Sequence, residues 1–155
     1  MHPAIPRDWK TRAMPEKHSS ITTKRFFNVA EFERIKIGVV PERMEDKWFI
    51  YFAEDRLFFH RSWTGVCVYE AYFESSENGA TLRSLEVNRR NDEYDGLNDQ
   101  CEVERANFLI DLLLLGRDVP FPSCEEENAP EALHAWNLAG SAIFRNGQGY
   151  DEPGS

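Results

Sequence analysis

The sequence predicts an α+β fold, in which helices pack on a four-stranded antiparallel meander sheet to form two layers. Residues 47–90 contain four runs rich in aromatic and β-branched residues, as is typical of strands, separated by three short turn signals. Segments with helical spacing of apolar residues flank this region on both sides. Short connections make consecutive strands antiparallel neighbours, so the predicted element order is α-β-β-β-β-α-α.

The first predicted element is a helix that begins after Asn28. Asn is a favoured N-cap residue, and Glu31 three residues later completes the pattern of a capping box. Apolar residues recur at helical spacing as far as Val39, and Gly38 and Pro41 mark the end of the helix.

Four strands are predicted next, at residues 47–53, 57–61, 66–73 and 80–89. The residues between these runs are turn formers. Gly65 is placed to adopt a positive φ after a type I turn, and Asn78-Gly79 is a strong hairpin signal.

Two more helices complete the predicted domain. Residues 101–117 present a wide apolar face and stop at Gly116, so this helix is expected to be largely buried across the sheet. Residues 130–144 are predicted to form the last helix, with Pro130 suited to its first turn.

Length and composition indicate one globular domain. The chain has 155 residues, of which 41% are hydrophobic and 13% aromatic, enough for a single core. The domain is predicted to span residues 25–146, between a flexible basic arm at residues 1–24 and a frayed tail at residues 147–155. The sequence has neither a secretory signal nor a run of about 18 apolar residues, so the expected location is cytoplasmic, without membrane binding.

Charge is distributed unevenly along the chain. The net charge of -9 divides into +4 for residues 1–25, -8 for residues 26–118 and -5 for residues 119–155. General nucleic-acid binding requires a basic face and is therefore not expected of this acidic body.

Neither a cofactor nor a metal site is expected. The sequence lacks the known phosphate-loop, dinucleotide-binding, zinc-protease, nucleophile-elbow and calcium-loop motifs. Only His60 and His134 belong to the predicted domain, too few for a metal site built from several histidines. The three cysteines, Cys67, Cys101 and Cys124, are widely spaced and are expected to be reduced, with Cys67 in the core.

The predicted functional site lies at one end of the sheet. Because neighbouring strands alternate in direction, segments 46–48, 60–65 and 88–90 should meet there. The residues expected to bind a ligand at this end are Lys47, His60, Arg61, Trp63, Arg89 and Arg90. Four cations, an imidazole and an indole that can stack suit an anionic small molecule with a planar part, such as a nucleotide-like ligand. The same set suits the acidic surface of a protein partner.

Several of these residues also have a purely structural interpretation. The hydroxyls of Ser62 and Thr64 can bond their own turn, and Arg61 can form an ion pair with a carboxylate such as that of Glu70. His60 stands at a strand end, where a histidine is commonly a hydrogen-bonded structural residue.

Three functions remain open from the sequence. The first is a binding domain for an anionic small molecule at the sheet end. The second is a protein-interaction module of the immunity or anti-defence type, because a small acidic body suits a partner of complementary charge. The third is a hydrolase or transferase in which His60 acts as general base and Asp46 orients it.

Four segments also support a resemblance: MEDKWFIYF, LFFHRSWTGVCVYEAYF, VNRR and FLIDLLLL. Together they resemble small bacterial proteins of uncharacterised function that carry an HRSWTG-like segment, over residues 38–115. The resemblance implies no activity, cofactor or catalytic residue.

Overall fold

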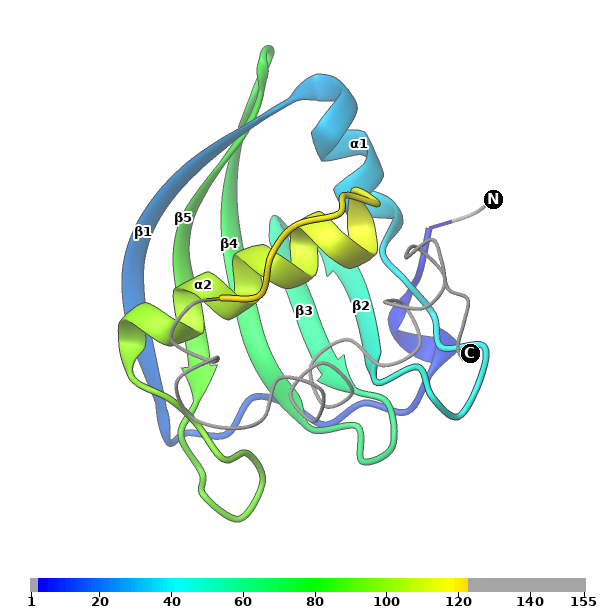
Figure 1. Ribbon diagram of the computed structural model, residues 1–155, viewed down its shortest axis with the longest axis vertical. Helices are drawn as coiled ribbons and strands as arrows, with labels where there is room; N and C mark the ends of the chain where they lie inside the picture. The colour runs from blue at the N-terminus through cyan, green and yellow to red at the C-terminus, as the bar shows by residue number, and fades with distance from the viewer. Residues whose placement is uncertain (1–2, 123–155) are drawn as a thin grey trace.

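The computed structural model describes residues 3–122 (Figure 1). Its elements, in chain order, are η1 (Pro6–Asp8), β1 (His18–Asn28), α1 (Val29–Ile37), β2 (Trp48–Ala53), β3 (Arg56–Arg61), β4 (Cys67–Ser76), β5 (Gly79–Asn88), α2 (Asp99–Leu109) and η2 (Ile110–Leu114). The helix predicted at 130–144 and the tail at 147–155 lie outside the described residues.

The fold is α+β, with one antiparallel sheet of strand order β1-β5-β4-β3-β2 (Figure 1). The predicted meander is confirmed, because β2 to β5 are neighbours in chain order. The prediction of four strands is wrong, because β1 adds a fifth beside β5, from His18 opposite Asn88 to Asn28 opposite Gly79. The order of the described elements is therefore β-α-β-β-β-β-α.

Part of the segment predicted to be a flexible arm forms the fifth strand. Residues 18–24, assigned to that arm, form the first part of β1. This strand lies at the edge of the sheet, and its side chains alternate between exposed and half-buried, with only Phe27 fully buried. Polar side chains fill the exposed positions except that of Phe26, so the strand lacks the long apolar run that identifies the central strands.

Local sequence signals explain the start of α1 and the tight turns. The side chain of Asn28 accepts a hydrogen bond from the Glu31 amide at 2.8 Å, and Glu31 returns one to the Asn28 amide, so the predicted capping box is confirmed. Glu54 and Asp55, the two turn residues between β2 and β3, both have positive φ, as a primed hairpin turn requires. Gly65 has the predicted positive φ, +79°.

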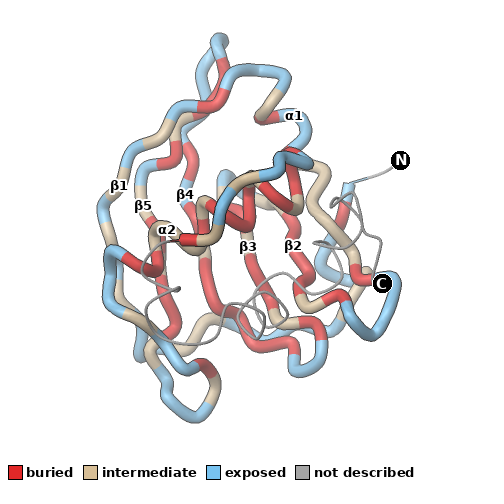
Figure 2. Tube along the Cα trace, viewed as in Figure 1, coloured by how far each residue is buried: buried red, intermediate tan, exposed pale blue. Residues whose placement is uncertain are grey.

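Both helices lie on one face of the sheet, with α2 running across the strands (Figure 1). This helix begins at Asp99, capped by Asn98, and continues as one π-helical turn, η2, before Gly116 adopts φ +66°. Its predicted burial across the sheet is confirmed. Buried residues are frequent in β2 to β5 and in α2, whereas β1 at the edge of the sheet has few (Figure 2).

The opposite face of the sheet, called here the open face, carries a much smaller apolar cluster. Phe49 and Tyr51 of β2 pack there against Ala4 and Trp9 of the N-terminal segment. Residues 4–17, called here the N-terminal strap, lead from this cluster along the sheet end to β1. The part of the predicted arm before β1 is therefore also packed on the body.

The cysteine prediction is correct in part. Cys67 is a free, buried thiol, and burial raises its pKa. Cys101, buried in the first turn of α2, is disulfide-bonded, so the expectation of a reduced thiol is wrong at this position.

Candidate functional site

The three segments predicted to form the sheet end lie at the same end of the sheet, and two of them, 46–48 and 60–65, are in direct contact. Trp48 and Arg61 are partners across the β2–β3 hairpin, and the amide of Ser62 donates to the Lys47 carbonyl at 2.9 Å. From β5, the side-chain amide of Asn88 donates to the Cys67 carbonyl at 2.8 Å. Their side chains, however, point in different directions.

His60 is buried on the open face. It is 2% exposed and stacks on Tyr51 with ring centroids 5.7 Å apart, beside Phe49 and Phe58. Its Nδ1 donates to the Gly65 carbonyl at 3.0 Å, while its Nε2 is buried without a hydrogen-bond partner. Burial lowers the pKa of His60, which favours the neutral ring.

Asp46 does not serve as the orienting acid of His60. Its carboxylate accepts the backbone amides of Glu42 and Arg43 at 2.9 and 3.2 Å, which fixes the loop before β2. The Nδ1 of His60, the nitrogen such an acid would bind, is occupied by a carbonyl instead. In this geometry His60 closes the β3–β4 turn through its bond to the Gly65 carbonyl.

Arg61 lies on the face that carries the helices. Its guanidinium is 4.9 Å from the centroid of the Trp48 ring, a cation–π contact. Burial and the nearby charge of Arg105 lower the pKa of Arg61. Glu70, considered from the sequence as a partner for Arg61, pairs instead with Arg56 at 3.2 Å on the open face.

Trp63, like Arg90, is an exposed member of the predicted site. Its side chain is 58% exposed, and its Nε1 donates to the Met44 carbonyl at 3.0 Å. The ammonium of Lys47 lies 4.8 Å from the centroid of its ring. The indole is thus held in one orientation at the tip of the β3–β4 turn.

Arg89 and Arg90 are neutralised by carboxylates that follow them in the chain. Arg89 pairs with Asp99 at 2.7 Å and with Glu102 at 3.2 Å. Arg90 pairs with Asp92 at 2.6 Å and with Glu93 at 3.4 Å. These two cations are therefore less available to an anionic ligand than the sequence implies.

Sequence reasoning missed a buried polar cluster beside Arg89. Glu102 is fully buried, and its carboxylate accepts the hydroxyls of Tyr69 and Tyr94 at 2.6 and 2.7 Å and the amide of Leu97 at 2.8 Å. Burial, the largest cause, raises the pKa of both tyrosines, so they remain hydrogen-bond donors. The cluster ties α2 to β4 and β5.

The polar turn itself anchors the N-terminal strap. The Trp9 indole donates to the Ser62 carbonyl at 2.7 Å, and the Arg12 amide donates to the Gly65 carbonyl at 2.8 Å. A Cβ on Gly65 would stand 3.2 Å from the Lys10 carbonyl oxygen, so the glycine permits this close approach. The turn hydroxyls are also structural: Ser62 Oγ donates to the Asp46 carbonyl, and Thr64 Oγ accepts the Val66 amide.

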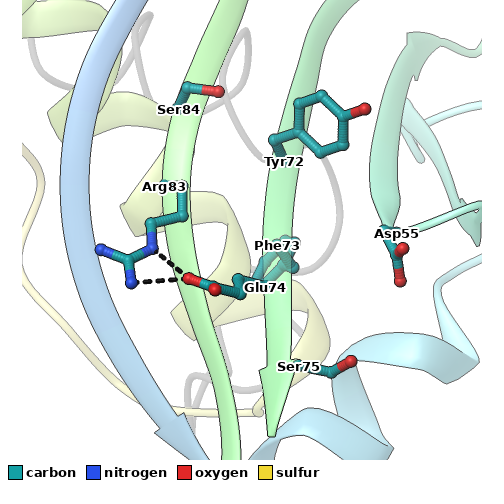
Figure 3. A pocket seen from close by; sticks show the side chains of 7 residues that line it. All are labelled: Asp55, Tyr72, Phe73, Glu74, Ser75, Arg83 and Ser84. Carbon is teal, nitrogen blue, oxygen red and sulfur yellow. Dashed lines mark hydrogen bonds and ion pairs between the residues drawn. The ribbon is translucent and has the colours of Figure 1, made fainter.

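A second candidate site lies on the open face, beyond the strap. A pocket of about 440 Å³ is lined by Asp55, Tyr72, Phe73, Glu74, Ser75, Arg83 and Ser84 (Figure 3). Arg83 is the extra residue of a β-bulge, since Tyr72 pairs with Ser84 and Phe73 with Leu82. Its guanidinium reaches Glu74 at 2.6 Å, an exposed pair that a partner could reorganise at small cost (Figure 3).

An adjoining pocket of about 280 Å³ shares Tyr72 with the first. Its lining consists of Met14, His18, Arg56, Glu70, Tyr72 and Glu86. Glu70 and Glu86 stand directly opposite each other on β4 and β5; Arg56 pairs with Glu70 at 3.2 Å, and the Nε2 of His18 lies 3.3 Å from Glu86. Alternation of Glu70, Tyr72 and Glu74 along the strand was the sequence signal for this solvent-facing row.

The two open-face pockets are net acidic. Together they are lined by four carboxylates and two guanidiniums, with His18 as the only imidazole. Tyr72 stands between them and is 43% exposed. Such a surface combines an aromatic anchor with excess negative charge.

Comparison with protein-family models, with curated proteins and with solved structures finds no match. Among residues 3–122, no three His, Cys, Asp or Glu side chains are grouped to hold a metal ion. The helices described in this part of the chain are all too short or too polar to cross a membrane.

Proposed function

We propose that the chain is a protein-interaction module that binds a basic segment of a partner on the open face of its sheet. The observation that carries this proposal is the pair of adjoining pockets at Tyr72, in which carboxylates outnumber guanidiniums by four to two. The net charge of -9 supports the proposal, because the electrostatic field of an acidic protein attracts a basic partner before the two surfaces are in contact.

The alternative of an anionic small molecule is less well supported at either place. On the open face, an anion would meet excess negative charge. At the sheet end, Arg89 and Arg90 already pair with four carboxylates, so an anion would have to displace them. An aromatic side chain such as Tyr72, which loses little conformational freedom on binding, suits a protein contact.

A peptide titration tests the proposal. Two nine-residue peptides of alternating residues, Arg with Ser and Glu with Ser, are added separately to the 15N-labelled chain. The arginine peptide should shift the amide signals of Tyr72, Glu74 and Arg83, and the glutamate peptide should not. Shifts confined to Lys47 and Trp63 with the glutamate peptide would instead support an anion-binding sheet end.

Matched variants sharpen the result. Tyr72→Ala and Glu86→Gln should each weaken binding of the arginine peptide by about fivefold, the effect of losing one anchor or one charge at an exposed interface. Glu33→Gln removes an equally negative but exposed side chain of α1 and should leave binding unchanged. If all three variants weakened binding equally, the binding would be non-specific charge attraction, and the proposal would be wrong.

A further inference from the structure

The N-terminal strap is held on the sheet by a small number of contacts along its length. They include the ion pair of Arg12 with Glu93 at 3.0 Å and a hydrogen bond from the Arg89 amide to the Lys17 carbonyl at 2.9 Å. Ala4 donates its amide to the Ile37 carbonyl at 2.7 Å, and Arg12 donates its amide to the Gly65 carbonyl at 2.8 Å. Between them, the indole of Trp9 bonds Ser62 and stacks on Phe49 with centroids 6.5 Å apart. Most other strap residues are exposed, and segments with few buried contacts open at low free-energy cost.

The sheet surface next to the strap contains the imidazole of His60, and only one of its two ring nitrogens has a hydrogen-bond partner. His60 Nδ1 donates to Gly65, at the same carbonyl oxygen that receives the Arg12 amide. His60 Nε2 is enclosed without a partner beside the rings of Phe49, Tyr51 and Phe58. In the neutral ring Nε2 is an acceptor, and its lack of a donor is tolerated in this apolar surrounding.

A second proton changes this balance. Protonated Nε2 becomes a charged donor that faces aromatic rings and has no acceptor within reach. Lifting the strap would admit water to that nitrogen and supply the missing acceptor. We propose that the N-terminal strap is an acid-released latch, opened when His60 takes up a proton at Nε2.

The groups that surround His60 do not offset the new charge. Tyr51 of β2 and Cys67 of β4 face the ring, and burial raises the pKa of each, so both stay neutral at mild acidity. Glu70, farther along β4, is already paired with Arg56. Glu93, whose charge also raises the pKa of Cys67, is already paired with Arg12 of the strap at 3.0 Å and with Arg90 at 3.4 Å.

The pH range follows from the direction of the shift. Burial lowers the pKa of His60 in the closed state, whereas a hydrated imidazole titrates near 6.5. The closed strap is therefore favoured above about pH 6.5 and is progressively lost as the pH falls below that value toward the closed-state pKa. This latch needs no partner, so it is tested in the chain alone, separately from the peptide titration, although Met14 of the strap lines the smaller open-face pocket.

Amide hydrogen exchange in the full chain tests the latch. The protection factors of the Ala4 and Arg12 amides, corrected for intrinsic exchange, should fall by up to about tenfold for each pH unit below 6.5. The amides of Tyr69 and Leu85, in the centre of the sheet, should keep their protection. Constant protection of Arg12 between pH 7.5 and pH 5 would overturn the proposal.

Two variants assign the effect. His60→Phe keeps a ring but cannot titrate, so Arg12 protection should become independent of pH. His18→Gln removes the other described histidine, which bonds the Pro15 carbonyl of the strap, and should leave the acid response intact. An unchanged acid response in His60→Phe, or its loss in His18→Gln, would refute the assignment to His60.

A direct titration covers the case in which His60→Phe does not fold. The ring carbon signals of His60 and the indole N–H signal of Trp9 are followed together in the wild-type chain. They should change with one midpoint, below pH 6.5. Separate midpoints would show that release of the strap does not depend on His60.

Discussion

Trp48 and Arg61 lie directly opposite each other across the β2–β3 hairpin, and the guanidinium of Arg61 rests 4.9 Å from the centre of the Trp48 ring. The same indole stacks on Tyr69 with an interplanar angle of 8°. The tyrosine hydroxyl in turn bonds the buried Glu102. Arg61 thus belongs to a packed column of side chains that connects the first hairpin to α2.

Replacing Arg61 should lower the free energy of unfolding. Arg61→Ala removes a partly buried cation–π contact and the packing of the arginine stem, for an expected loss of about 1–2 kcal/mol. Urea denaturation measures the loss. Arg83→Ala, which breaks only an exposed ion pair on the open face, should cost less than about 0.5 kcal/mol. Equal losses in the two variants would contradict the role of the column.

Glu102 is expected to be the most sensitive acidic residue of the fold. Glu102→Gln replaces one carboxylate oxygen by a donor and leaves the guanidinium of Arg89 without its buried partner. The free energy of unfolding at pH 7 should fall by about 3 kcal/mol, as for a broken buried pair. Chemical denaturation of Glu33→Gln, an exposed residue of α1, provides the control, with an expected change below about 0.5 kcal/mol. A loss under 1 kcal/mol at Glu102 would mean that the cluster can rearrange around the amide.

Gly65 should not tolerate a side chain. Its φ of +79° disfavours any residue with a Cβ, and the added atom would press on the Lys10 carbonyl at 3.2 Å. Gly65→Ala is expected to lower the free energy of unfolding by about 1–2 kcal/mol and to reduce protection of the Arg12 amide. The neighbouring change Thr64→Ala loses one turn hydrogen bond and should leave that amide protected. If both variants expose Arg12 equally, the turn hydrogen bond, not the glycine, positions the strap.

Tyr51 should make stability depend on alkaline pH. Burial raises its pKa to about 12, against about 10 for an unfolded chain. The folded state therefore holds the phenolic proton more tightly, and this contribution is complete below about pH 10 and is lost as the pH rises toward 12. Melting temperatures of the wild-type chain and Tyr51→Phe should converge or cross over that interval. Parallel curves from pH 9 to pH 12 would contradict a buried, protonated Tyr51.

Much of the fold could be read from local signals. Asn28 and Glu31 set the start of α1, and the aromatic runs of β2 and β3 are separated by two turn residues that define their hairpin. The edge strand β1 escaped prediction because its partner is distant in sequence, with His18 opposite Asn88, and because polar side chains fill most of its outer positions. Its local signals were the run Ile21, Thr22, Thr23 and the pair Phe26, Phe27.

The sequence could predict which end of the sheet carries these residues, but it could not predict which of their charges are paired. Strand order alone brings Lys47, Arg61 and Arg89 to one end of the sheet. It does not reveal that Arg89 finds Glu102, a residue in a polar stretch of α2 that looks solvent-facing in the sequence and is fully buried in the fold. The sequence gives the number of charged side chains. Whether each charge is available to a ligand depends on the ion-pair partners that the tertiary structure brings to it.

The position of β1 has a consequence for synthesis of the chain on the ribosome. The residues with which this strand pairs, Gly79–Asn88, are synthesised about sixty residues after it. At a synthesis rate of about 5–20 residues per second, the backbone hydrogen-bonding groups of the nascent strand have no strand partner for several seconds. The lysine, serines and threonines that made β1 hard to predict are also polar side chains, which keep such an unpaired segment solvated and disfavour its association with neighbouring chains.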